Sequence, residues 1–240
     1  MKKSLTICIP LFNEEEGVHN LYKELINEIE NIQEYVDLKI ILVNDGSTDS
    51  TQTLLEKFFK ENIFEIVAHK NNLNLDGFLK TSLSLCNTDY IAFLDSDCTY
   101  SPKIISEMLN YLDEDLDVIS ASPWHPQGSV VGLSKSRVFI SKSANFVYRT
   151  IMNKKIYTSS SILKIYKYET IKDIQIKSKG FVAITELYCK TLLKKSMFLE
   201  FPCKLNIRIF GSSKIQFTAT VISHLKFMLH LILFRIKFKN

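Results

Sequence analysis

Two aspartates separated by one serine, Asp95 and Asp97 around Ser96, are the residues best suited to chemistry. They directly follow Tyr90–Leu94, an apolar run typical of a buried strand. Carboxylates at this spacing can converge on a hard divalent cation, which binds diphosphate oxygens and neutralises charge on a leaving group. The same triplet also occurs as an ordinary solvated loop, so its position after a strand is what favours a site. We predict that Asp95 and Asp97 bind Mg²⁺ or Mn²⁺, and residue types do not separate the two metals.

A second polar segment, Pro10–Glu14, follows the apolar run Leu5–Ile9. Proline fixes the turn, Phe12 can pack on a base or ribose, and the Glu14 carboxylate can accept hydrogen bonds. Asn13 could equally cap the helix that follows, and the two roles are compatible. The segment is therefore a candidate nucleotide contact.

A third polar loop, Asn44–Asp49, follows Lys39–Val43, a predicted strand. Gly46 permits a tight turn, and Asp45 can face a nucleotide edge. A plain turn ending in a helix cap at Asp49 would need no ligand. The loop is a candidate ligand contact because it follows a predicted strand, as the other two loops do.

Strands that alternate with helices should position these loops. Such alternation predicts an α/β fold with a mostly parallel central sheet flanked by helices, and ligands that bind beyond the carboxyl ends of the strands. All three loops should then open on one edge of the sheet. The expected strands are residues 5–9, 39–43, 64–68, 90–94 and 118–121 with another near 198, and the expected helices include 18–32, 136–152 and 181–194.

The amino-acid composition limits the binding partners and the cellular location that can be expected. The net charge of +4 comes from 30 basic and 26 acidic residues, too small an excess to indicate a nucleic-acid partner. Basic residues dominate from Lys135 onward, which suits anionic phosphates or an anionic membrane surface, or is an ordinary solvated surface. Five scattered cysteines without a CxxC pair, and no apolar signal core after Met1, predict a reduced, cytoplasmic location.

The segment from Gln216 to Asn240 is apolar but interrupted by Lys226 and Arg235, which argues against a membrane-spanning helix. Its polar residues form a narrow stripe on a helical wheel, a pattern typical of a helix lying in a membrane interface. A helix packed on the domain would show the same broad apolar face. We predict a catalytic domain over residues 1–215 and an amphipathic, membrane-interface helix over 216–240, peripheral to the cytoplasmic face of a membrane.

Five motifs in order resemble one family. Together they are similar to the polyprenyl-phosphate (dolichol-phosphate) mannosyltransferase group of the inverting GT-A glycosyltransferases of the family 2 type, over roughly residues 4–215. The resemblance implies a GT-A, Rossmann-like fold and a nucleotide-sugar donor. The motifs are PLFNEEE (10–16), ILVNDGSTDST (41–51), DYIAFLDSDCTYSP (89–102), RVFIS (137–141) and RIFGSSK (208–214).

Matching positions carry the family's roles by resemblance. Asp95 and Asp97 would bind the metal, and Glu186, in a GF…E pattern that begins at Gly180, would orient the acceptor. Asp97 and Glu186 are thus the catalytic candidates. The nucleotide-sugar contacts implied are Pro10, Phe12, Glu14, Val43, Asp45, Asp95, Ser96 and Asp97, and the acceptor or phosphate contacts implied are Arg137, Ser141, Arg208 and Lys214.

The chain departs from the group's pattern in several places. Thr99 stands where a glutamine is usual, Asn44 replaces an aspartate, and Pro123 stands where an arginine is expected. The segment Thr158–Lys164 lacks the usual acid and glycine. These changes leave the sugar and the acceptor open more than the fold or the metal site.

The predicted reaction is a single inverting displacement. A hexose, mannose first, would move from GDP-mannose or a UDP-hexose to a polyprenyl phosphate, whose second pKa of about 6 leaves it largely ionised without a general base. An alcohol acceptor on a surface polysaccharide would instead need a base, with Glu186 as candidate. A non-catalytic nucleotide-sugar-binding protein is a further alternative. A Rossmann dehydrogenase is disfavoured because no GxGxxG follows the first strand.

Overall fold

The computed structural model describes residues 2–112, 115–210 and 217–237 of the 240-residue chain. Within these residues, seven strands form one sheet in the order β3-β2-β1-β4-β7-β5-β8, and a short parallel pair, β6 (Ser129–Val130) with β9 (Lys204–Leu205), stands apart. The strands of the large sheet are β1 (Lys3–Leu11), β2 (Val36–Asn44), β3 (Phe64–Ala68), β4 (Tyr90–Phe93), β5 (Val118–Ser122), β7 (Lys164–Lys167) and β8 (Phe198–Pro202).

The strand directions bring the polar loops to one edge of the sheet. β1 pairs in parallel with β2 and β4, and β2 pairs in parallel with β3. β7 runs antiparallel to both β4 and β5, while β8 is parallel to β5. Six strands therefore end at the same edge, and β7 begins there.

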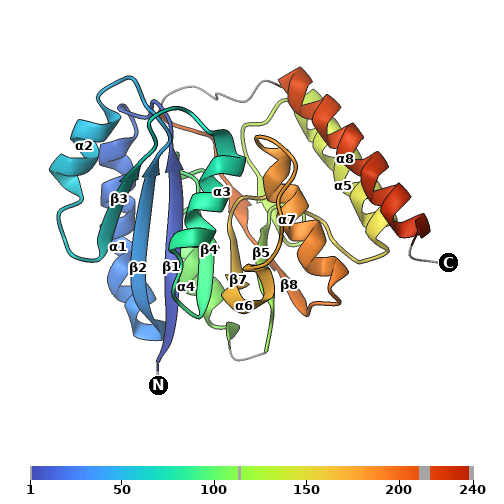
Figure 1. Ribbon diagram of the computed structural model, residues 1–240, viewed down its shortest axis with the longest axis horizontal. Coiled ribbons are helices and arrows are strands. Elements are labelled where there is room, and N and C mark those ends of the chain that lie inside the picture. Colours follow the sequence, from blue (N-terminus) through green and yellow to red (C-terminus); the bar gives the residue numbers. More distant parts are fainter. Residues whose placement is uncertain (1, 113–114, 211–216, 238–240) are drawn as a thin grey trace.

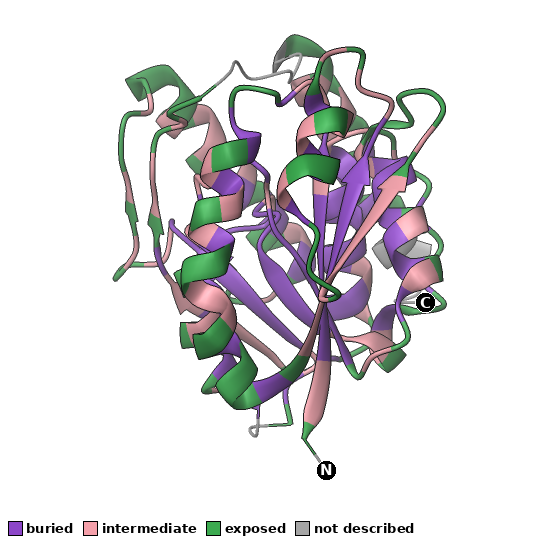
Figure 2. Ribbon diagram, turned by 90° about the vertical axis from the view of Figure 1, so that its left-hand side faces the viewer, coloured by how far each residue is buried: buried purple, intermediate pink, exposed green. Residues whose placement is uncertain are grey.

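The central strands are apolar along their length because both faces of the sheet are covered. Ile7, Ile40 and Ala92 occupy one row across β2, β1 and β4, and all three are buried. Figure 2 shows this buried centre between exposed outer helix faces. The predicted α/β fold with a mostly parallel, helix-flanked sheet is confirmed.

The helices form a layer on each face. α3 and α7 lie in front of the sheet in Figure 1, and α1 and α4 lie behind it. α1 buries Val18, Leu21, Leu25 and Ile32, the apolar stripe that its sequence shows. The helices are α1 (Val18–Tyr35), α2 (Thr51–Phe58), α3 (Asn74–Leu85), α4 (Lys103–Leu109), α5 (Lys135–Met152), α6 (Tyr168–Ile171), α7 (Val182–Leu193) and α8 (Phe217–Lys237).

The C-terminal helix α8 lies beside α5 at the far end of the sheet (Figure 1). Its inner face buries Phe227, Met228 and Leu231, while Leu225 and Leu229 are more than half exposed. The helix therefore packs on the domain and still presents an apolar outer face. No helix of the described chain has the length and apolar content needed to span a membrane.

Candidate active site

The two aspartates after β4 share one threonine. The Thr99 hydroxyl donates to Oδ2 of Asp95 at 2.7 Å, and the Thr99 backbone N–H donates to Oδ1 of Asp97 at 3.0 Å. Asp95 is partly exposed as a residue, but its Oδ1 atom is buried and has no hydrogen-bond partner in the described residues. Burial first, and then the charge of Asp97, raise the pKa of Asp95 well above its ordinary value.

This arrangement fits a divalent cation. A cation at Asp95 and Asp97 would offset the repulsion between the two carboxylates and engage the unpaired Oδ1. No cluster of three or more His, Cys, Asp or Glu side chains suited to a metal exists in the described part of the chain. The protein would then supply two carboxylates and leave other positions to water and phosphate oxygens, as is usual for Mg²⁺.

Arg208 joins this loop to the loop after β1. Its guanidinium pairs with the Glu14 carboxylate and lies 3.4 Å from Oδ2 of Asp97, while its Nε donates to the Phe210 carbonyl at 2.6 Å. Glu14 and Arg208 are 194 positions apart in the sequence. The structure thus brings together three predicted site residues, two of them anionic and one cationic.

The loops after β1 and β2 are held together by reciprocal hydrogen bonds. The Asn13 N–H donates to the Ser47 hydroxyl at 2.9 Å, and the Thr48 N–H donates to the Asn13 side-chain oxygen at 2.8 Å. The Glu14 N–H donates to the Thr51 hydroxyl at 2.8 Å. Asn13 has a φ of 53°, a left-handed conformation that asparagine tolerates better than most residues. These bonds position Glu14 beside Arg208.

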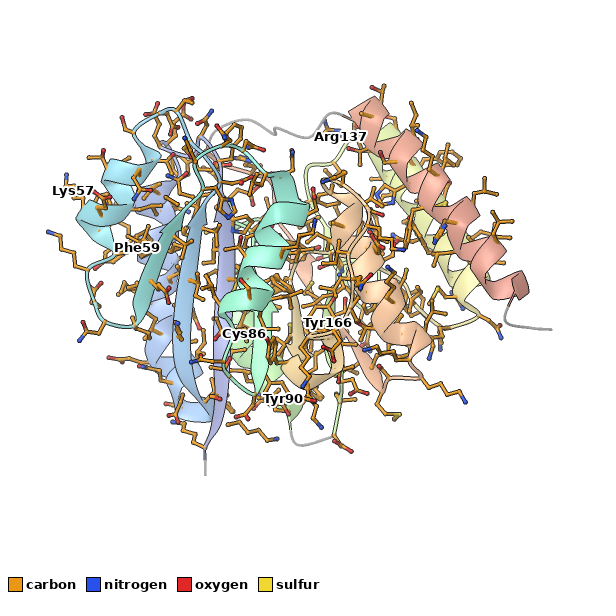
Figure 3. All side chains as sticks on the ribbon, in the orientation of Figure 1. Lys57, Phe59, Cys86, Tyr90, Arg137 and Tyr166 are labelled. Carbon is orange, nitrogen blue, oxygen red and sulfur yellow. The ribbon has the colours of Figure 1, made fainter. Side chains whose placement is uncertain are left out.

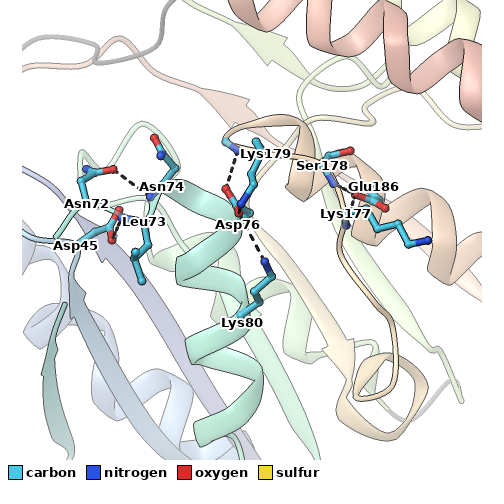
Figure 4. A network of polar contacts seen from close by, with 11 residues as sticks. Asp45, Asn72, Leu73, Asn74, Asp76, Lys80, Lys177, Ser178, Lys179 and Glu186 are labelled. Atoms are coloured by element: carbon cyan, nitrogen blue, oxygen red, sulfur yellow. Dashed lines mark hydrogen bonds and ion pairs between the residues drawn. The ribbon is translucent and has the colours of Figure 1, made fainter. Parts of the chain in front are cut away.

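Asp45 is buried and is bound by the loop between β3 and α3. Its Oδ1 lies 2.6 Å from Nδ1 of His69. The same oxygen accepts the Leu73 N–H at 2.8 Å (Figure 4). The other ring nitrogen of His69 lies 2.8 Å from the Thr81 hydroxyl. Sequence reasoning missed His69, although its place directly after the third strand was the available signal. Asp45 therefore orders two neighbouring loops of the same edge.

The remaining predicted nucleotide contacts lie around these loops. Pro10 and Val43 are direct neighbours in the β1–β2 pairing, with Val43 buried and Pro10 partly exposed. Phe12 is partly exposed beside Asn13, and Ser96 is buried between the two aspartates. All four sit at the carboxyl edge, and their contacts with a nucleotide stay a prediction.

Glu186 lies on α7 and is committed to neighbouring groups. Its carboxylate accepts the N–H groups of Lys177 and Ser178 (Figure 4). It also pairs with Lys190 at 2.6 Å. Burial favours the neutral form, but the hydrogen bonds from Lys190 and Ser178 outweigh it and lower the pKa of Glu186. The neighbouring loop is tied to α3, because Asp76 accepts the Gly180 N–H at 2.9 Å. These bonds fix the loop at residues 177–180.

The predicted acceptor residues on α5 are accessible. Arg137 is exposed in the first turn, where its N–H donates to the capping hydroxyl of Ser134 at 3.4 Å, and Figure 3 places it at the end of α5 nearest the carboxyl edge. Ser141 is partly exposed one turn later. Lys214 lies outside the described residues.

Glu200 of β8 places a carboxylate beside the segment Thr158–Lys164, which has no acidic residue of its own. Its two carboxylate oxygens accept the N–H groups of Tyr157, at 2.6 Å, and Thr158, at 2.9 Å. Lys164 is fully buried at the other end of the segment, where its ammonium donates to the Ser161 carbonyl, and burial lowers its pKa to about 7. Neither Glu200 nor a buried role for Lys164 was predicted.

The comparison with known families decides the membership. Residues 6–175 match the sequence pattern of "Glycosyl transferase family 2". The chain belongs to glycosyl transferase family 2. The predicted recognition is thereby confirmed.

Characterised relatives within family 2 act on different acceptors. The chain is 25% identical over 185 residues to the poly(ribitol-phosphate) beta-N-acetylglucosaminyltransferase of Staphylococcus aureus, covering 77% of this chain and 55% of that protein. It is 23% identical over 214 residues to the dolichol-phosphate mannosyltransferase of Pyrococcus furiosus, covering 88% and 59%. The chain thus spans little more than half the length of these relatives.

The family 2 fold is also found among solved structures. Glucosyl-3-phosphoglycerate synthase from Mycobacterium tuberculosis superposes with a TM-score of 0.69 at 15% identity, over 94% of this chain and 80% of that one. That enzyme was crystallised with Mn²⁺, uridine diphosphate and glucosyl-3-phosphoglycerate, and in another structure with Mg²⁺ and uridine diphosphate. The likeness supports the GT-A type of fold.

Proposed function

We propose that this family 2 chain transfers a hexose, mannose in the first instance, from a nucleotide-sugar to a polyprenyl phosphate with inversion at the anomeric carbon. The observation that carries the proposal is the meeting of Asp95, Asp97, Glu14 and Arg208 at one sheet edge. Carboxylates there can hold a cation, and a guanidinium beside them can hold phosphate oxygens. The donor would be GDP-mannose or a UDP-hexose.

The donor end of the reaction needs charge neutralisation. Asp95 and Asp97 would hold Mg²⁺ or Mn²⁺, which stabilises the negative charge of the departing diphosphate. Arg208 adds a fixed positive charge beside Asp97, and its planar fork suits bidentate contact with phosphate. Structures of the mycobacterial synthase with Mn²⁺ or Mg²⁺ and uridine diphosphate support this assignment.

A phosphate acceptor suits the acceptor end better than an alcohol. An ionised phosphate oxygen can attack without losing a proton, so the site needs no strong general base. Glu186, the candidate base, has a lowered pKa and is bound to Lys190 and two backbone N–H groups. A carboxylate so engaged is a weak base and a good structural anchor.

The faces of α5 and α8 support attachment to a membrane surface. A groove of about 580 Å³ along α5 is lined by Leu133, Phe139 and Phe146 together with Lys135 and Lys142. Apolar side chains beside ammonium groups match acyl chains beneath anionic headgroups. We therefore propose a peripheral position on the cytoplasmic face of a membrane, with residues 1–215 as the catalytic domain and 216–240 as the interfacial helix. Exposed apolar residues of α8 are Ile222, Leu225, Leu229, Ile232 and Leu233.

A second candidate is transfer to a hydroxyl of a surface polysaccharide. The relatives favour it, because the staphylococcal enzyme is named for poly(ribitol-phosphate), and an abequosyltransferase of Salmonella typhimurium is 29% identical over 117 residues, 48% of this chain and 34% of that protein. Such an acceptor would use the same donor site and require a base at the acceptor end.

The deciding experiment has two stages. GDP- and UDP-sugars are first screened for thermal stabilisation of the protein with and without Mg²⁺ or Mn²⁺. The best donor is then incubated with polyprenyl phosphate in vesicles or with a defined polysaccharide, and products are identified by mass spectrometry. A glycosyl polyprenyl phosphate is expected. Product only on polysaccharide would establish the second candidate, and donor binding without any transfer would indicate a non-catalytic nucleotide-sugar-binding protein.

A further inference from the structure

Two cations of α5 each lie over an aromatic ring. Lys142 Nζ lies 5.5 Å from the centre of the Trp124 ring, and the guanidinium carbon of Arg149 lies 5.3 Å from the centre of the Tyr157 ring. Lys142 and Arg149 are seven positions apart on α5, so both lie on one face of the helix. We refer to these four side chains as the ring-cation cluster.

The cluster belongs to the same sheet edge as the metal loop. β7 lies between β4 and β5 in the sheet. β4 ends in the loop of Asp95, β5 ends two residues before Trp124, and β7 begins seven residues after Tyr157, all at the carboxyl edge. The two ring-bearing segments therefore adjoin this edge, next to the metal loop in the order of the strands.

Hydrogen bonds fix the backbone beneath both rings. The Tyr157 N–H is held by Glu200, and the Trp124 N–H donates to the Thr158 hydroxyl oxygen at 3.3 Å. That same oxygen lies 2.8 Å from the Ser122 hydroxyl. The two ring-bearing segments are thus joined to each other and to β8. A pair of rings held in this way is preorganised for a ligand.

The two cations remain available to an anion. Lys142 and Arg149 are exposed, and no carboxylate pairs with either in the part of the chain that the structure describes. Each instead rests over an aromatic face, an interaction that is weak at exposed sites. An arriving phosphate could form charge-assisted hydrogen bonds with both without displacing a competing carboxylate.

We propose that the ring-cation cluster binds the acceptor as a phosphate ester. Lys142 and Arg149 hold the phosphate, and Trp124 and Tyr157 pack against the carbon group that carries it. This deepens the proposed function and rests on it, since it requires a phosphate-bearing acceptor beside the donor. The cluster differs from the pair assigned by resemblance, because at about 100° per residue Arg137 lies roughly 120–140° around α5 from Lys142 and Arg149.

The carbon group could be an isoprenyl chain or a saccharide, which share this chemistry. The groove along α5 includes Lys142 in its lining, so a lipid chain could run from the cluster onto the apolar face of the helix. A phosphorylated sugar would instead lay its ring against Trp124, since sugar C–H faces pack on aromatic rings. Both sources place the phosphate at the same two cations.

Trp124 provides a direct test because it is the single tryptophan of the chain. Its fluorescence is recorded during titration with farnesyl phosphate, a hexose phosphate and inorganic phosphate. A saturable change is expected with at least one ester, at lower concentration than with inorganic phosphate. The double variant Lys142→Gln/Arg149→Gln should raise the apparent Kd about tenfold or more, as expected for lost hydrogen bonds to a charged group. The tighter ester identifies the source.

The matched control is Lys103→Gln, which removes a lysine charge from α4, where Lys103 lies 4.0 Å from Glu107 on the surface. It should leave the apparent Kd unchanged. The proposal is overturned by the absence of a saturable change with both esters, by an unchanged Kd in the double variant, by equal weakening in the control, or by inorganic phosphate binding as tightly as both esters.

Thermal stabilisation of the wild-type chain by nucleoside diphosphate and metal reports the donor site separately. Donor binding without a Trp124 response overturns the ring-cation site alone. A Trp124 response without donor binding overturns the sugar-transfer proposal and supports a phosphate-ester site.

Discussion

The guanidinium of Arg208 lies 3.4 Å from a carboxylate oxygen of Asp97. The same guanidinium pairs with Glu14, so a single cation spans the loops after β1 and β4. A divalent cation at Asp95 and Asp97 would share this carboxylate with Arg208. Metal and arginine are therefore partial competitors for Asp97, and both attract a diphosphate.

Arg208→Gln should separate these two effects. Without nucleotide, the affinity of the aspartate pair for Mn²⁺ should rise, because a neighbouring positive charge is gone. The affinity for nucleoside diphosphate should fall about tenfold, since a charge-assisted contact is lost. Calorimetric titrations with Mn²⁺ alone and with nucleotide measure both. Arg208→Lys keeps the charge without the planar guanidinium, so both of its affinities should lie between those of the wild type and of Arg208→Gln. If Arg208→Gln lowered the affinity for Mn²⁺ as well as that for nucleoside diphosphate, Arg208 and the metal would not compete for Asp97.

Asp97→Ala should strongly reduce metal-dependent transfer. Loss of one metal-holding carboxylate removes stabilisation of the leaving diphosphate, and by analogy with lost transition-state contacts we expect a drop of roughly 10²–10³ in kcat. Transfer is measured across a Mn²⁺ titration. Asp37→Ala is the control, since Asp37 is exposed at the opposite end of β2. An unchanged kcat in Asp97→Ala would contradict the assignment of the metal site to Asp95 and Asp97.

Glu186→Gln distinguishes a base from an anchor. A general base typically contributes 10²–10⁴ in rate. We expect less than about a tenfold decrease in kcat together with a loss of about 1–3 kcal/mol in stability, because the charged partner of Lys190 disappears. Rates and denaturant unfolding are measured on the same preparation. A rate loss of three orders of magnitude with an unchanged midpoint would assign catalysis to Glu186 and favour an alcohol acceptor.

Asp76→Asn should loosen the loop at residues 177–180. Asp76 is almost fully buried and accepts the Gly180 N–H at 2.9 Å. It also pairs with Lys179 at 3.0 Å (Figure 4). The neutral amide keeps an oxygen for the Gly180 N–H but removes the buried charge that strengthens this bond and pairs with Lys179, a loss of about 1–3 kcal/mol. Lys80→Gln, which removes the exposed partner at 3.7 Å, should cost at most about 1 kcal/mol. Urea unfolding compares the two variants, and equal losses would show that the loop does not depend on Asp76.

The sequence predicts the alternating core and the edge well, because periodic burial leaves a local trace. It does not reveal α3, whose buried positions include Asp76, Gly77 and Ser82 and so lack an apolar stripe. The sequence does not predict strand β7 for a related reason, because β7 is only four residues long and begins with a buried lysine. Its antiparallel direction also breaks the alternation rule that predicts the rest.

For the site, too, the sequence predicts local features but not the contacts between distant residues. Loops after strands are visible in the sequence, so Asp95, Asp97 and Glu14 were predicted without knowledge of their neighbours. The contacts among them were not, because Arg208 reaches Glu14 across 194 positions and no local pattern encodes that distance. Glu200 was likewise hidden, since its role is to supply an acid to a distant segment.

The attachment of α8 should depend on pH through His224. Nδ1 of His224 lies 2.8 Å from the Tyr148 hydroxyl, between α8 and α5. Burial lowers the pKa of His224 from 6.5 to about 4. Between these values the unfolded or detached helix binds a proton that the docked helix does not, so docking is strongest above pH 6.5 and weakens as the pH falls toward 4.

Hydrogen exchange of α8 amides at pH 7 and pH 5, corrected for intrinsic exchange rates, measures this directly. Protection of α8 should fall at pH 5 in the wild type, while strand β1 stays protected. His224→Gln should show the same protection at both pH values, because the titrating group is gone. His230→Gln, which changes an exposed histidine on the same helix, should keep the wild-type response. A pH response that persists in His224→Gln would place the titrating group elsewhere at the contact between α5 and α8.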